Sequence, residues 1–152
     1  MRVRFEFDAE KCTACGACAV ACMDQNDVDI TAGQQPYRKV CVVEREGRRI
    51  YRSIACRHCA NAPCVSACPV GCITKDEETE LTRVDTASCI GCRACAAVCP
   101  SEAPTVRPVK GAPGRVRMEK CHGCFSRIEA GLTPACVHAC PTGALTVSRE
   151  EK

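Results

Sequence analysis

Residues 89–100 read "CIGCRACAAVCP" and carry four cysteines at the spacing C-x2-C-x2-C-x3-C-P. The first three cysteines lie close enough in sequence to share one tight loop. The last step is about one helical turn, so it carries the chain away from that loop toward a neighbouring site. The proline that follows fixes φ and removes a backbone N–H donor, which turns the chain into its next segment. The spacing therefore predicts a loop that provides three metal ligands and passes a fourth to a neighbouring site.

The same arrangement occurs three more times in this chain of 152 residues and 18 cysteines. Residues 12–22 have the same spacing, although Met23 stands where the other groups have proline, while residues 56–69 have an x4 gap and residues 121–141 an x11 gap. Every group ends in C-x3-C. The members are Cys12, Cys15, Cys18 and Cys22; Cys56, Cys59, Cys64 and Cys68; Cys89, Cys92, Cys95 and Cys99; and Cys121, Cys124, Cys136 and Cys140. This internal repeat indicates one binding unit used four times.

Disulfides, zinc and iron–sulfur clusters are the three uses of so much cysteine. The opening "MRVRFEFDAEKC" has no apolar signal segment, so we expect a cytoplasmic protein, in which dense cysteine is metal-bound. Zinc sites usually consist of two C-x2-C pairs, which gives no reason for a terminal C-x3-C-P. The spacing is instead typical of bacterial ferredoxins, and it predicts four [4Fe–4S] clusters.

Composition agrees with a fold that depends on metal. Aromatic residues make up 3% of the chain and tryptophan is absent, which is little material for a core. The formal charge is +3, but four clusters with their thiolates bring the loaded protein to about −5. No Lys/Arg block with interleaved aromatic residues is present, so nucleic acid is not an expected partner. No apolar run is long enough for a membrane span.

Short strands and loops are expected between the cysteine groups. Alternating residues predict a strand at 2–8, and residues 37–45 and 48–54 predict a hairpin around Glu46 and Gly47. A short helix within residues 124–136, closed by Gly131 and Pro134, explains the x11 gap of the fourth group. Further strands are expected at 81–85, 104–109, 114–119 and 144–148, and polar or Gly/Pro-rich connections at 24–35 and 109–114.

Taken together, the four groups resemble the four-cluster ferredoxin-type electron-transfer subunits. Such subunits accompany molybdopterin or tungstopterin enzymes such as dimethyl sulfoxide reductase, formate dehydrogenase and polysulfide reductase, and related polyferredoxins serve hydrogenases. The resemblance implies an α+β fold of two ferredoxin-like lobes related by pseudo-two-fold symmetry, with a small core organised around four clusters. One lobe would comprise residues 1–55 and 110–152, including the hairpin 37–54, and the other residues 56–109.

The resemblance also implies which cysteines share a cluster. The fourth cysteine of each group would bind the partner cluster of the same lobe. The implied sets are Cys12, Cys15, Cys18 and Cys140 for cluster 1; Cys56, Cys59, Cys64 and Cys99 for cluster 2; Cys89, Cys92, Cys95 and Cys68 for cluster 3; and Cys121, Cys124, Cys136 and Cys22 for cluster 4.

No nucleophile with a base, phosphate-cradling loop or open metal site is recognisable, so the chain is not expected to be catalytic alone. The resemblance implies an electron wire between a large catalytic oxidoreductase subunit and a second redox protein. The preferred catalytic partner is a formate dehydrogenase or CO2 reductase, alone or in a complex that includes a hydrogenase. A reductase of a terminal acceptor is the second choice. The alternatives are a free polyferredoxin shuttle and, in another class, a structural zinc or metal-storage protein.

Several residues near the ligands are candidates for tuning or packing. The three histidines lie inside ligand groups and are expected to be loop residues, and one or more of the cations that flank ligands is expected to set a cluster potential. Cys41 lies in a strand pattern and is expected to pack. Cys72 occupies the position of Ala103 and Ala144 in the third and fourth groups, so it too is expected to be a packing residue. The histidines are His58, His122 and His138, and the cations are Lys11, Arg57, Arg93, Lys120 and Arg127.

Overall fold

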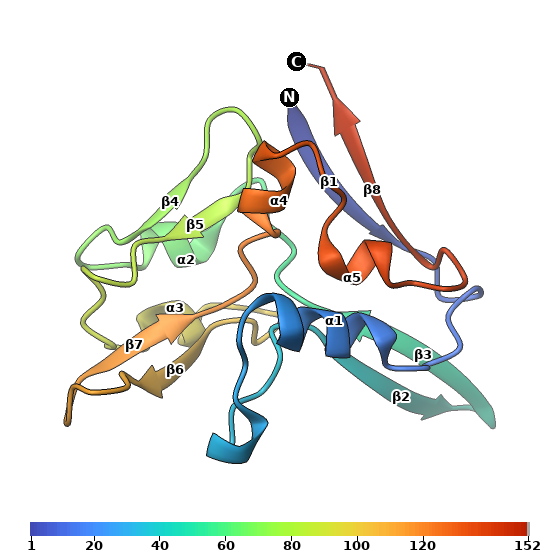
Figure 1. The fold of residues 1–152 in the computed structure, drawn as a ribbon, viewed down its shortest axis with the longest axis horizontal. Helices are drawn as coiled ribbons and strands as arrows, with labels where there is room; N and C mark the ends of the chain where they lie inside the picture. The colour runs from blue at the N-terminus through green and yellow to red at the C-terminus, as the bar shows by residue number, and fades with distance from the viewer. Residues whose placement is uncertain (152) are drawn as a thin grey trace.

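The computed structural model describes residues 1–151, in which eight short strands form four separate two-stranded antiparallel sheets (Figure 1). The chain ends pair with each other through β1 and β8, so the first and last cysteine groups are brought to the same side of the molecule. The pairs are β1 (Arg2–Phe7) with β8 (Leu145–Glu150), β2 (Lys39–Arg45) with β3 (Arg48–Ile54), β4 (Ile73–Lys75) with β5 (Thr82–Val84), and β6 (Thr105–Pro108) with β7 (Val116–Glu119).

Four of the helices carry the third cysteine of a group. They are α1 (Ala17–Gln25), α2 (Pro63–Ser66), α3 (Ala94–Ala97) and α5 (Ala135–His138). The last three stop before a Cys-Pro pair, because proline cannot continue a helix. Helix α1 has Met23 in place of that proline, so it runs on through Cys22 to nine residues.

Two further helical segments lie between the groups. Helix α4 (Phe125–Glu129) lies inside the fourth ligand group, and a 3-10 helix, η1 (Ile30–Ala32), lies in the connection after α1. Within residues 1–151, no helix combines the length and apolar character needed to cross a membrane.

The repeat in the sequence is also a repeat of backbone conformation. The second residue between the first two cysteines of every group has a positive φ, and so does the third residue after the last cysteine in groups two to four. In those three groups, the positive-φ residue donates its backbone N–H to the carbonyl of that cysteine at 3.2 to 3.4 Å. The residues are Ala14, His58, Gly91 and Gly123 in the first position, and Gly71, Glu102 and Gly143 in the second. All four ligand loops thus share the first turn, and groups two to four also share the second.

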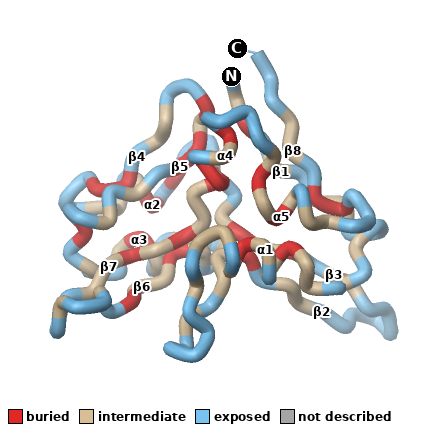
Figure 2. Tube along the Cα trace, in the orientation of Figure 1, coloured by how far each residue is buried: buried red, intermediate tan, exposed pale blue. Residues whose placement is uncertain are grey.

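The buried residues lie toward the interior, whereas the ends of the hairpins and the connection after α1 are exposed (Figure 2). Cysteine makes up a large part of this buried core. Eight of the 18 buried hydrophobic residues among those described are cysteines. A two-stranded sheet is at best marginally stable alone, and four of them do not share one sheet. The fold therefore depends on what the cysteines bind.

Most sequence expectations for the secondary structure are confirmed. The hairpin is β2–β3, the strand at 2–8 is β1, and the helix within 124–136 is α4. Strand β4 and the helix η1 were not expected. The β6–β7 hairpin spans residue 110, where the lobe boundary was expected, so strands from both sides of that boundary pair with each other. The lobe limits and the pseudo-two-fold symmetry stay predictions.

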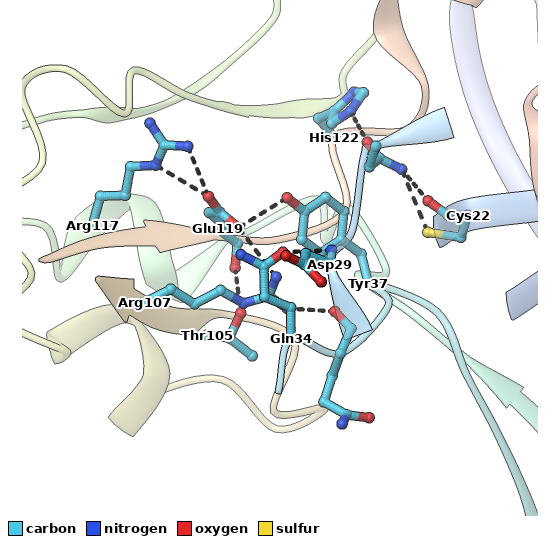
Figure 3. A network of polar contacts seen from close by, with 11 residues as sticks. Cys22, Asp29, Gln34, Tyr37, Thr105, Arg107, Arg117, Glu119 and His122 are labelled. Carbon is cyan, nitrogen blue, oxygen red and sulfur yellow. Dashed lines mark hydrogen bonds and ion pairs between the residues drawn. The ribbon is translucent and has the colours of Figure 1, made fainter. Parts of the chain in front are cut away.

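A buried polar network fastens the segment after α1 to the β6–β7 hairpin (Figure 3). Tyr37 donates a hydrogen bond from its hydroxyl to Glu119 Oε2 at 3.1 Å, and Arg107 Nη1 lies 3.3 Å from the same oxygen. Arg107 also donates to the carbonyl of Gln35. Because Arg107 and Glu119 are both largely buried, this network fixes residues 35–37 against the hairpin.

Gly123, in the fourth ligand loop, offers a test of how tightly that loop is packed. Its φ is +72°, and a Cβ there would lie 2.8 Å from Cδ1 of Leu81, which is fully buried. We expect Gly123→Ala to cost about 2–4 kcal/mol, from the left-handed backbone and the overlap together. The measurement is the thermal unfolding transition of the anaerobic holo-protein.

Gly131 is the matched control, because its φ is +75° and a Cβ there would meet nothing within 4 Å. Gly131→Ala should lose only about 1–2 kcal/mol, the backbone contribution. Equal losses at the two positions would contradict close packing of Leu81 on this loop.

Candidate metal centres

The first ligand loop meets the end of α5. A cavity in the structure is lined by Cys12, Cys15 and Cys18 from the N-terminal loop and by Cys140 from the end of the chain. Cys18 and Cys140 also belong to one packed cluster with Cys136 and Leu145. The four cysteines that the resemblance assigns to cluster 1 therefore surround one space.

The third ligand loop makes a second such space. Its cavity is lined by Cys89, Cys92 and Cys95, and by Cys68 from the end of the second group. Backbone N–H groups point at Cys89 Sγ from Gly91, at 3.4 Å, and from Met118, at 3.3 Å. Amides directed at sulfur favour a thiolate or cluster sulfur over a neutral thiol.

The other two sets are also brought together, although less completely. Burial raises the pKa of Cys64, and the charges of Cys56 and Cys99 raise it further, so these three thiols are neighbours. Cys59 packs on the same cluster as Cys64.

In the fourth set, the charge of Cys136 raises the pKa of both Cys22 and Cys124, in addition to the larger effect of burial, so these three thiols are neighbours too. Cys121 faces the second group: its Sγ lies 3.9 Å from His58 Nε2. Within residues 1–151, no three His, Cys, Asp or Glu side chains converge on a point that could hold one metal ion.

The last cysteine of groups two to four lies in a turn that favours the thiolate. Burial alone would raise the pKa of Cys68, Cys99 and Cys140, but hydrogen bonds lower each pKa below its ordinary value. For Cys68 and Cys99 the largest of these hydrogen bonds comes from a side chain, that of Cys72 and that of Ser101. The backbone donors come from the residues just after each Cys-Pro pair: Val70, Cys72 and Ile73; Ser101, Glu102 and Ala103; Thr142, Ala144 and Leu145. The turn that follows the fourth cysteine thus prepares it as a ligand.

The cysteines inside the molecule behave in the opposite way. Burial raises the pKa of Cys22, Cys95 and Cys124, and it raises the pKa of Cys121 to about 12. A buried thiol gives up its proton readily only when a cation replaces it, so these side chains are suited to bind metal rather than to remain free thiolates.

Two buried cations lie among these cysteines. Lys120 is 4% exposed, and its Nζ donates to the carbonyls of Thr82, at 2.8 Å, and Cys121, at 3.0 Å, and lies 3.6 Å from Cys56 Sγ. Of these three contacts only the sulfur can carry negative charge. Lys120 therefore joins the first cysteine of group two to the first cysteine of group four.

The sequence did not single out Arg38, the second of these cations. Arg38 donates to Ser53 Oγ at 3.1 Å, and Ser53 Oγ lies 3.4 Å from Cys18 Sγ. Its Nε is buried with no hydrogen-bond partner in the described part of the chain. Its charge lowers the pKa of Cys22 and Cys121 against the larger effect of burial. No spacing rule could have found it, because it reaches the cysteines from the segment that precedes β2.

Two of the histidines are neutral hydrogen-bonding residues rather than ligands. Burial lowers the pKa of His58 to about 3, and its Nδ1 accepts the N–H of Thr82 at 3.0 Å. The proton of the ring is therefore on Nε2, facing Cys121.

His122 is linked to Cys22 by hydrogen bonds through Asn26, as Figure 3 shows in part. Its Nδ1 accepts from the N–H of Phe125, and its Nε2 lies 2.8 Å from Asn26 Oδ1. Asn26 in turn donates from Nδ2 to Cys22 Sγ at 3.6 Å. His138 is exposed at the end of α5. His58 and His122 lie in ligand loops, as expected, whereas His138 is the last residue of α5.

Comparison with known families decides what these loops hold. A family model described as a 4Fe–4S dicluster domain matches residues 47–150, and a 4Fe–4S binding domain matches residues 5–22. The chain belongs to the ferredoxin-type iron–sulfur family. Together the two matches contain all sixteen cysteines of the four groups, and this ferredoxin-type subunit carries four [4Fe–4S] clusters.

Curated relatives span almost the whole chain. The B subunit of anaerobic dimethyl sulfoxide reductase from Haemophilus influenzae is 37% identical over 151 residues, covering 93% of this chain and 71% of the relative. The thiosulfate reductase electron transfer subunit PhsB of Salmonella typhi is also 37% identical, covering 93% of this chain and 73% of the relative. An uncharacterized ferredoxin-like protein, YdhX of Escherichia coli, is 33% identical, covering 95% of this chain and 64% of the relative.

The residues present fit such clusters. One cavity is lined by four cysteines and another by five, and each contains members of two separate groups. Backbone amides point at ligand sulfur, and the buried cations Lys120 and Arg38 lie where thiolate charge would gather. A bound [4Fe–4S] cluster supplies reversible one-electron transfer. The chain supplies the thiolates, the hydrogen bonds and the buried charge that set each potential.

Proposed function

We propose that this ferredoxin-type subunit is an electron wire between a catalytic oxidoreductase subunit and a second redox protein. The observation that carries the proposal is the cavity in which Cys140 joins Cys12, Cys15 and Cys18. This arrangement supports ligand sharing between distant groups, which holds neighbouring clusters close together.

The ligand sets form part of this proposal. Clusters 1 and 4 exchange Cys140 and Cys22, and clusters 2 and 3 exchange Cys99 and Cys68. The cavity that Cys68 lines supports the set of cluster 3. The charges that act on Cys64 and on Cys124 come from other members of their own sets, which supports clusters 2 and 4.

The packing of the cysteines supports the order 1–4–2–3 for the wire. Clusters 1 and 4 meet where Cys18 packs with Cys136. Clusters 4 and 2 meet at Lys120, between Cys121 and Cys56. Clusters 2 and 3 meet where Cys64 packs in one core with Cys89 and Cys95. The two ends of the order, clusters 1 and 3, would face the two partners.

Lys120 is the cation expected to set a potential in the middle of the wire. Replacing it by glutamine removes a buried positive charge 3.6 Å from Cys56 Sγ, so we expect the midpoint potential of cluster 2 to fall. An EPR-monitored redox titration of the holo-protein measures the shift.

Lys11 is the matched control, because it flanks Cys12 but its side chain is 61% exposed and paired with Asp8 at 3.3 Å. Solvent screens such a charge, so Lys11→Gln should leave all midpoints unchanged. Equal shifts in both variants, or none in either, would contradict a special role for Lys120.

For the partner, the names of the relatives favour a reductase of a terminal acceptor. Two of the three relatives belong to dimethyl sulfoxide and thiosulfate reductases, so we propose a molybdopterin reductase as the catalytic subunit. The formate dehydrogenase, CO2 reductase and hydrogenase partners preferred from the resemblance have no support among these names.

Affinity purification of the tagged chain under anaerobic conditions tests this choice. A large subunit in equal amount, carrying a molybdopterin, is the expected result. Recovery of the loaded chain alone would favour the free polyferredoxin shuttle instead, while a colourless chain loaded with zinc would favour the structural or storage protein.

A further inference from the structure

Cluster 3 has a fifth thiol beside its four expected ligands. Cys72 lines the same cavity as Cys68, Cys89, Cys92 and Cys95. Its Sγ lies 3.4 Å from Cys68 Sγ, which is a hydrogen-bond distance for two sulfur atoms, and it also interacts with Cys89. Cys72 is 5% exposed. It therefore touches two thiols of the set and faces the interior of the site, which is more than a packing role requires.

The backbone holds the two thiols in fixed relation. Gly71, with φ +63°, closes the turn between them by donating its N–H to the carbonyl of Cys68 at 3.3 Å. The carbonyl of Cys72 accepts the N–H of Asp85 at 2.8 Å, which anchors it just before β4. Both sulfur atoms therefore approach the cavity from one rigid turn rather than from a loose loop.

We propose that Cys72 is a reserve ligand for cluster 3, able to bind the iron of Cys68 when that thiolate is absent. The proposal rests on the assignment of Cys68 to cluster 3 made above. In the exchange, the Fe–S bond to Cys68 breaks and a bond to Cys72 forms, while the Cys72 proton passes to the Cys68 sulfur along the contact between them. The iron keeps its oxidation state and the site keeps its charge. In a chain without the Cys68 sulfur, the proton goes to water.

The other groups contain the control for this proposal. Groups three and four end in the same turn, in which Glu102 and Gly143 take the place of Gly71, but Ala103 and Ala144 stand where group two has Cys72. Cys99 and Cys140 thus have the same local backbone as Cys68 and no second thiol four residues on. Loss of the last cysteine should have a different outcome in group two than in groups three and four.

The test compares iron, acid-labile sulfide and EPR spectra of the full-length chain after anaerobic cluster loading. We expect Cys68→Ala to keep the parent iron content without a [3Fe–4S] signal, and Cys68→Ala/Cys72→Ala to lose between one and about four iron per chain. Cys72→Ala alone should match the parent. Cys99→Ala and Cys140→Ala should each lose iron as single variants.

Equal iron loss in Cys68→Ala and in the double variant would overturn the proposal. The proposal would also be overturned if Cys68→Ala failed to accumulate as folded protein while Cys99→Ala and Cys140→Ala did accumulate. A transplant gives an independent reading, since Ala103→Cys should restore iron to the Cys99→Ala chain and no restoration would count against the reserve role. Full iron in both single controls would instead refute the shared-ligand assignment, which separates the two failures.

Discussion

Removal of iron and sulfide from the anaerobic, reduced chain is expected to abolish its cooperative unfolding transition. Eight of the 18 buried hydrophobic residues described are cysteines, and the strands form four isolated pairs. Net stabilities of small domains are only about 5–15 kcal/mol, and this chain has few large apolar residues with which to replace its metal contacts. Without the clusters, the Fe–S bonds that hold the ligand loops together are lost, and the apolar surface of the thiols is too small to offset the entropy of ordering those loops.

Far-UV circular dichroism and amide NMR dispersion would measure this loss. Reductant must be present throughout, so that the free thiols do not form disulfides that would stabilise the apo chain in place of the clusters. The holo-protein treated with a mild zinc chelator is the control and should keep its transition. An apo chain with a sigmoidal melt and dispersed amide signals would show that the apolar cluster of Leu81 and Phe125 suffices for folding, contrary to expectation.

The second large effect concerns Cys22, which is proposed to bind the cluster of the fourth group. We expect Cys22→Ala to lose between one and about four iron per chain, and to lose them from the cluster of Cys124. The reason is that Cys22 and Cys124 both interact with Cys136, whereas the cavity of Cys12 is completed by Cys140.

Pairs of variants distinguish this from ligation within one group. Cys22→Ala/Cys124→Ala removes two ligands of one cluster, so its iron loss should not exceed about four per chain, the content of that cluster. Cys22→Ala/Cys12→Ala removes ligands of two clusters, so the losses should add. The reverse pattern would refute the exchange between groups. Cys41→Ala, at a half-buried strand position away from the four groups, should leave the iron content unchanged.

The division of the cysteines into four similar loops could be predicted from sequence because such a loop is a local structure. Spacing and proline determine which residues face one site and where each short helix ends, and Met23 even accounts for the longer α1. The hairpin β2–β3 was predictable for the same reason, since its turn residues lie between its strands.

What the sequence could not provide are contacts between residues far apart in the chain. Lys120 lies beside Cys56, and Arg38 reaches Ser53 and, through it, Cys18, only because the chain folds back. Cys72 illustrates the same limit. Alignment with Ala103 and Ala144 gave it a packing role, and only its distance to Cys68 revealed a second thiol in the site.

The number of electrons that the chain accepts tests the central claim most directly. Anaerobic coulometric reduction of the purified, fully loaded chain should take up about four electrons per chain, one for each [4Fe–4S] cluster. An uptake of none, as for zinc, or of about two would contradict a four-cluster wire.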